Sequence, residues 1–135
     1  MFFCALIGLS GVAQDLKVMD VPAVVKTALS KEFPAASKVS WEKEKGNYEA
    51  NWGGRSGEDN SAQFTPSGNF IELVQNIPIS SLPSKVPSYV NAHYSGAKIK
   101  EAGKVTYAGG THGYEVEIKG KDLIFDLAGN FVKEG

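Results

Sequence analysis

Residues 64–70 read FTPSGNF, and residues 125–131 read FDLAGNF, 61 positions further along the chain. Each stretch places a phenylalanine, three residues, and then Gly-Asn-Phe. Glycine and asparagine tolerate the left-handed backbone that tight turns often need, and the flanking phenylalanines suit two strands that face a core. The motif therefore predicts a β-turn between antiparallel strands, present twice. A phosphate-holding loop is the alternative, but no helix N-terminus follows to supply aligned N–H groups.

Other matches extend this repetition in both directions. YEANW at 48–52 matches YEVEI at 114–118, and the pair Val21-Pro22 matches Leu82-Pro83. The stretch 76–87, NIPISSLPSKVP, is rich in proline and serine and is typical of a connection. We therefore expect two copies of one unit, at residues 21–72 and 82–134, within a single domain at 14–135.

Each copy begins with a helical pattern. In the first copy the apolar residues recur with the spacing of one helix face, at Val21, Val24, Val25, Ala28, Leu29 and Phe33. We expect Asp20 to cap this helix, Pro22 to lie in its first turn and Pro34 to end it. In the second copy, Val86, Tyr89, Val90 and Tyr94 form the stripe, and Ser84 is the expected cap.

Strands follow each helix, because apolar and polar residues then alternate with a period of two. The pairs Gly46-Asn47 and Gly120-Lys121 are expected to form tight hairpin turns. One unit buries only one sheet face and would be marginal alone. The sequence therefore predicts an α+β fold in which two tandem helix-plus-strand repeats form one antiparallel sheet of about eight strands, with both helices on one face.

The N-terminal segment predicts export. Residues 1–9 are apolar, and the small residues Gly11 and Ala13 follow, as in a secretory signal cleaved after Ala13. A buried N-terminal strand is the alternative. With export, we expect a periplasmic or secreted protein that begins at Gln14, contains no cysteine because Cys4 is removed, and has no transmembrane segment.

Composition excludes several classes of function. The net charge of −1 is not that of an electrostatic nucleic-acid binder. His93 and His112 are the sole histidines, and no nucleophile, zinc or phosphate-loop motif accompanies them. We expect His93 to pack on the second helix and His112 to lie in a loop. We therefore predict no enzymatic activity, no catalytic residue, no metal site and no cofactor.

Acidic residues alternate along the strands, on the side opposite the apolar residues. They are Glu42, Glu44, Glu49, Glu115, Glu117 and Asp126. Such acids form either a solvated face or a binding face for a basic peptide or a cation. Trp41 and Trp52 share the phase of the apolar residues, so core packing is favoured over a role in a binding hot spot.

One loop is longer in the first copy than in the second. The additional residues, 53–60, read GGRSGEDN. They form either a tolerated surface insertion or a protruding loop that contacts a partner, with Arg55, Glu58 and Asp59 as its charged tips.

The stretch 21–50, VPAVVKTALSKEFPAASKVSWEKEKGNYEA, together with both Gly-Asn-Phe turns, resembles a family of exported bacterial PepSY-like proteins. The resemblance covers about residues 20–134. It implies a fold like that of beta-lactamase inhibitor protein, a periplasmic or secreted location, and no assigned cofactor or catalytic residue. No inhibitory motif is shared, and that inhibitor's disulfides have no counterpart here.

We therefore expect an exported, non-enzymatic protein-binding or inhibitor-like module, whose partner is a protein or peptide of the envelope. The residues expected to bind it are Arg55, Glu58, Asp59, Glu49, Glu115 and Glu117. Two alternatives remain, a binder of a small ligand or cation that uses the acidic sheet face, and a structural component of the envelope.

Overall fold

The computed structural model describes residues 14–135, and the expected signal segment 1–13 lies outside the described residues. In this described part of the chain, two α-helices and two short 3-10 helices, η1 and η2, accompany the strands. In chain order the elements are β1 (Gln14–Leu16), η1 (Val18–Asp20), α1 (Ala23–Glu32), β2 (Ser40–Glu44), β3 (Asn47–Trp52), β4 (Asn60–Phe64), β5 (Phe70–Ile77), η2 (Ile79–Ser81), α2 (Lys85–His93), β6 (Glu101–Tyr107), β7 (His112–Ile118), β8 (Lys121–Asp126) and β9 (Phe131–Glu134).

The strands form one antiparallel sheet in which they lie in chain order, from β1 to β9. The predicted α+β fold is thus confirmed. Within residues 14–135 the sheet has nine strands rather than about eight, because Gln14–Leu16 adds a short edge strand on β2, with Leu16 opposite Trp41. Strands β5 and β6 join the two halves of the sheet.

Both Gly-Asn-Phe motifs form the predicted turns. Phe64 pairs with Phe70, and Phe125 pairs with Phe131. The φ angles of Gly68 and Gly129 are 89° and 94°, which a side chain would strain. In the first turn the Gly68 N–H donates to the Thr65 carbonyl at 2.9 Å, and in the second the Gly129 N–H donates to the Asp126 carbonyl at 3.0 Å.

The first helix starts differently from its prediction. Asp20 ends η1, and Pro22 occupies the N-cap position of α1 with no side-chain cap. A tight 3-10 turn before the proline takes the place of the expected aspartate cap. Val24 is 50% exposed and so lies outside the buried stripe. The second helix begins after Ser84, as predicted, although the serine side chain makes no capping hydrogen bond.

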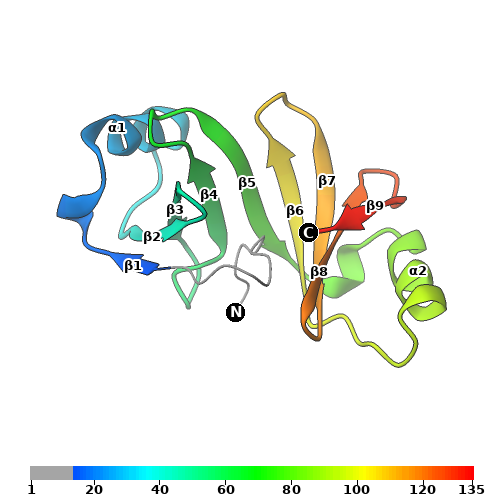
Figure 1. Cartoon of the computed structure of the whole chain (residues 1–135). Helices are drawn as coiled ribbons and strands as arrows, with labels where there is room; N and C mark the ends of the chain where they lie inside the picture. Colours follow the sequence, from blue (N-terminus) through cyan, green and yellow to red (C-terminus); the bar gives the residue numbers. More distant parts are fainter. Residues whose placement is uncertain (1–13) are drawn as a thin grey trace.

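Two hydrophobic clusters lie on the same face of the sheet, one under each helix. In the first, Val25 and Leu29 of α1 pack with strand residues that include Trp41 and Phe64. The second cluster contains Val86 and Val90 of α2, with the strand residues Ala102, Val116, Ile118, Leu123 and Phe125. The helices themselves lie at opposite ends of the long sheet (Figure 1). This arrangement is consistent with two copies of one unit.

The two hairpin turns are each displaced by one residue from their predicted places. The β2–β3 turn consists of Lys45 and Gly46, with φ angles of 52° and 82°, and Asn47 already pairs with Glu44. The β7–β8 turn consists of Lys119 and Gly120, because Lys121 pairs with Ile118. In both turns the second central residue is a glycine with a positive φ, and in the first turn Lys45 has a positive φ as well.

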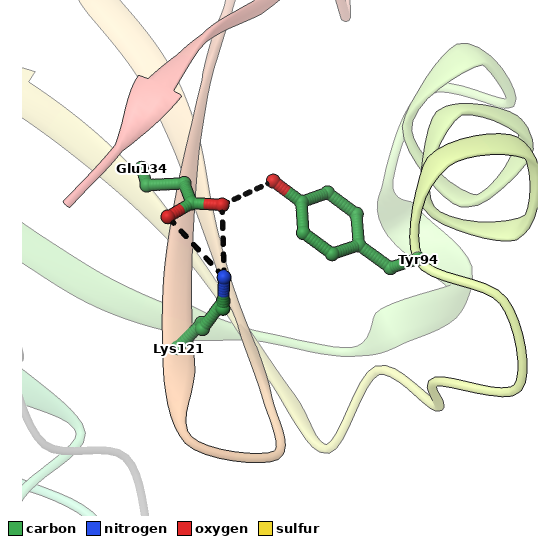
Figure 2. A network of polar contacts seen from close by, with 3 residues as sticks. All are labelled: Tyr94, Lys121 and Glu134. Carbon is green, nitrogen blue, oxygen red and sulfur yellow. Dashed lines mark hydrogen bonds and ion pairs between the residues drawn. The ribbon is translucent and has the colours of Figure 1, made fainter.

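A polar contact fastens the end of α2 to the edge of the sheet (Figure 2). The Tyr94 hydroxyl donates to Glu134 at 2.6 Å, and Lys121 approaches the same carboxylate at 3.2 Å. This hydrogen bond to the carboxylate raises the pKa of Tyr94 to about 12. The same bond, followed by the contact with Lys121, lowers the pKa of Glu134 and so favours its ionised form.

Candidate functional site

Carboxylates gather on the sheet face opposite the helices, which we call the acidic face. The strand register places Glu42 opposite Glu49, and Glu117 opposite both Glu101 and Asp122. The acidic side chains that the strands contribute to this face are Asp15, Glu42, Glu44, Glu49, Glu72, Glu101, Glu115, Glu117 and Asp122. Within residues 14–135, neither helix packs against this face.

Several of these carboxylates are buried, so the solvated-face interpretation is wrong for them. Glu44 is 5% exposed, Glu49 is 3% exposed and Glu115 is fully buried. Glu49 accepts a hydrogen bond from Asn51, which in turn accepts one from Ser61. Both oxygens of Glu115, in contrast, accept no hydrogen bond within the described part of the chain. An unpaired buried carboxyl is costly, and Glu115 is therefore the most unusual side chain of the face.

The acidic face is concave. Strands β2 and β8 are far apart in the strand order, yet Asp122 of β8 and Glu72 of β5 both act electrostatically on Glu44 of β2. A hollow of about 300 Å³ is lined by Glu44 and Glu72 and also by Ile124 and Lys133 of the last two strands. The twist of a long sheet thus brings its two halves toward each other on this side, which explains how side chains that alternate outward become buried.

Burial and neighbouring carboxylates raise the pKa values across the acidic face. Burial, followed by the charges of neighbouring acids, raises the pKa of Glu44 to about 7 and that of Asp122 to about 7. The same causes raise the pKa of Glu115 well above its usual value. Burial, and then the charges of Asp15 and Glu58, raise the pKa of Glu42 as well. The face therefore holds protons near neutral pH.

The loop at 53–60 contributes to this face. Glu58 is half-buried rather than at a loop tip, and its pKa is raised by burial and then by neighbours that include Glu101 and Asp15. The Asp59 carboxylate lies against Gly54, where a Cβ would meet it at 2.2 Å. Arg55 is exposed at the turn of the loop. Of the residues predicted to bind a partner, Glu49, Glu58, Glu115 and Glu117 thus lie on the acidic face, and Arg55 and Asp59 lie in the loop outside it.

The remaining candidate residues have structural roles. Asp126 belongs to the turn rather than to the acidic face, since its Oδ1 accepts the backbone N–H groups of Ala128 and Asn130. The Asn130 N–H foremost, and then the side chain of Asn130, lower the pKa of Asp126. Trp41 is 4% exposed in the first core cluster, and Trp52 packs beside Phe33 with ring centroids 5.4 Å apart. Both tryptophans are therefore packing residues.

The two histidines do not approach a common site. His93 is exposed and stacks on Tyr89, with centroids 4.0 Å apart. His112 opens strand β7 rather than lying in a loop, and its Nδ1 is 3.1 Å from the Thr106 hydroxyl. In the part of the chain that the structure describes, no three histidine, cysteine, aspartate or glutamate side chains are grouped so as to hold a metal ion.

A family model described as "Putative beta-lactamase-inhibitor-like, PepSY-like" matches residues 10–55 and 51–133. The chain belongs to this PepSY-like family. No curated protein matches the chain. None of the helices within residues 14–135 is long and apolar enough to cross a membrane.

Solved structures from Bacteroides share the fold of this PepSY-like chain. A "putative periplasmic" protein from Bacteroides eggerthii is 19% identical, with a TM-score of 0.68 over 85% of this chain and 88% of that chain. A DUF2874 family protein from Bacteroides uniformis is 21% identical, with a TM-score of 0.68 over 84% and 88%. A BLIP-like protein from Bacteroides fragilis is 20% identical, with a TM-score of 0.63 over 84% of each chain. At these identities the likeness concerns the fold alone.

Sequence reasoning missed four acids of the PepSY-like sheet, Asp15, Glu72, Glu101 and Asp122. Glu72 lies in FIELVQNI and alternates with Leu73, so the period of two could have revealed it. Glu101 and Asp122 each lie near the start of a strand, where too few strand residues precede them to show an alternation of apolar and polar side chains. The strand register places all four on the same face of the sheet.

Proposed function

We propose that this PepSY-like chain is an exported, non-enzymatic protein-binding module that engages a partner in the periplasm or outside the cell through its acidic face. The family supports this proposal, as do the periplasmic descriptions of structures with the same fold. The signal expected at residues 1–13 supports export in the same way. We further propose that the chain carries no catalytic residue, metal or cofactor.

The observation that carries the proposal is the buried carboxylate of Glu115. A buried acid without a hydrogen-bond donor destabilises a fold, so folding alone gives no reason for it. The neighbouring acids further disfavour the ionised form of Glu115, because the charges of four other carboxylates raise its pKa. A partner that brings donors or positive charge to this face would offset that cost on binding.

We assign direct partner contacts to Glu117 on the sheet and Glu58 in the loop, which are part-exposed. The buried Glu49 and Glu115 contribute to binding from beneath this surface, through their effect on its charge. Arg55 and Asp59 extend the contact from the rim of the same surface. The second half of the sheet folds without such a loop. The residues of this loop can therefore serve binding rather than folding.

A second candidate is the binding of a small ligand or cation, which the hollow of about 300 Å³ favours. A thermal-shift series with metal ions, polyamines and small anions separates the two candidates. Stabilisation by a small compound alone, with no captured protein, would support the second.

Capture from the envelope of the native organism tests the first candidate. A tagged protein with Glu42→Gln and Glu117→Gln removes two charges from the acidic face. Its matched control carries Asp20→Asn and Glu32→Gln, which remove two exposed charges beside and within α1. We expect the control to retain the partner. The amount of partner captured by the acidic-face variant should fall roughly tenfold or more. Equal capture by both variants would contradict binding through this face, and absence of any partner would favour a structural role.

A further inference from the structure

The hollow at one end of the acidic face combines carboxylates with apolar surface. Glu44 and Glu72 line it together with Tyr107 and Ile124. Glu44 is 5% exposed, and its Oε2 accepts no hydrogen bond within residues 14–135. Such a buried oxygen, on a residue that lines a cavity, is an acceptor that lacks a donor.

A second unpaired acid lies directly beside the hollow. Glu115 pairs in register with Ile124, which lines the hollow, and interacts electrostatically with Glu72, which lines it as well. Both oxygens of Glu115 also lack donors among the described residues. The chain's own cations at the hollow are Lys45 and Lys133, and both side chains are exposed. They lower the pKa values of Glu44 and Glu72, respectively, without reversing the effect of burial.

The geometry points to a lysine or arginine side chain of a basic polypeptide segment as the occupant of this hollow. This inference rests on the proposed function and names the chemistry of its partner. An aliphatic stem would lie on Ile124 and the Tyr107 ring, and the charged head would donate to Glu44 and Glu72. Arginine suits the position well, because its planar head has several donors.

Charge complementarity favours an extended basic segment over a single small cation. The acids continue from the hollow along the concave face to Glu117 and Asp122 on one side and to Glu42 on the other. Successive basic side chains of one extended segment would therefore each lie beside a carboxylate of the face. A metal ion is disfavoured, because the described acids do not converge in groups of three.

Binding of a cation here releases protons, and this provides a specific signature. A positive charge near Glu44 stabilises its ionised form, so the pKa of about 7 falls on binding. Calorimetric titration of the purified protein near pH 7 in two buffers of different ionisation enthalpy measures that release. The probes are acetylated hexa-arginine and hexa-lysine peptides, with hexa-glutamate, spermidine and calcium chloride as comparisons.

We expect the basic peptides to bind with release of protons and hexa-glutamate not to bind. Glu44→Gln and Glu72→Gln should each weaken binding roughly tenfold or more, because each variant loses one charge-assisted hydrogen bond. Glu44→Gln should also reduce the proton release. Lys133→Ala should strengthen binding, since it removes a competing cation. Glu32→Gln, which removes a charge on α1, is the matched control and should change nothing.

Basic peptides that bind wild type and both glutamine variants equally would overturn the inference, as would the absence of binding. Tighter binding of spermidine or calcium would replace the polypeptide with a small cation. If the envelope partner is still captured through the acidic face while basic peptides fail, the proposed function stands and this inference falls.

Discussion

Single glycines determine how closely the repeated turns approach the helices. A Cβ on Gly129 would lie 3.1 Å from the Cβ atoms of both Pro83 and Lys85, at the start of α2. A Cβ on Gly68 would meet Val24 of α1 at 3.0 Å. Each glycine thus serves the turn through its positive φ and serves the packing through its missing side chain.

Gly129→Ala tests these two roles together, and Gly120→Ala tests the first alone. Gly120 has a φ of 75° with open space around its Cα, so its alanine variant should lose about 1–2 kcal/mol of unfolding free energy from backbone strain. Gly129→Ala should lose about 1 kcal/mol more, because Pro83 and Lys85 must shift. Chemical denaturation measures both values, and equal losses would show that the turn is not packed against the helix.

At the scale of elements, the sequence contained most of the fold. Helical spacing predicted both helices, and the Gly-Asn-Phe motifs predicted their turns correctly. The hairpin turns were misplaced by one residue, because Asn47 and Lys121 fit a turn by composition yet pair within the ladder. The burial of Glu44 and Glu115 could not be predicted, since alternation shows which face a residue occupies and does not show how a sheet curves.

The loop at 53–60 is the element whose role is most easily separated from folding. The Asp59 carbonyl accepts the Asn76 N–H at 2.9 Å, so its last residues belong to the sheet and should be retained. Replacing residues 53–58 with Gly-Lys should leave the melting temperature nearly unchanged and weaken partner capture. Glu58→Gln in the full-length loop separates the loss of charge from the loss of length.

A large drop in melting temperature for the shortened protein would show that the loop is structural. Unchanged capture of the envelope partner would remove the loop from the binding surface.

For the whole molecule, the acidic face makes stability depend on pH. The carboxyls with raised pKa are neutral in both states at low pH, and the unfolded chain ionises first as pH rises above 4.5. The folded state then binds more protons, so the unfolding free energy falls with increasing pH until about 7, where Glu44 and Asp122 ionise when folded.

The protein should therefore melt at a higher temperature near about pH 5 than near about pH 8. Glu115→Gln keeps the shape and removes the titrating group, so it should stabilise the protein by about 1–3 kcal/mol at the higher pH and by little at the lower one. Thermal unfolding at both pH values checks this difference. A stability that rises with pH would mean that these acids are paired when folded.

NMR locates directly the surface of the protein that binds a basic peptide. Backbone amide shifts of the isotope-labelled protein are followed while the hexa-arginine peptide is added. We expect the amide shifts of the acidic face to change, most of all near the hollow, at Glu72, Tyr107 and Ile124. The amide shifts of α1 and α2 should stay unchanged. Shifts confined to the helices, or spread evenly over the molecule, would contradict binding at the acidic face.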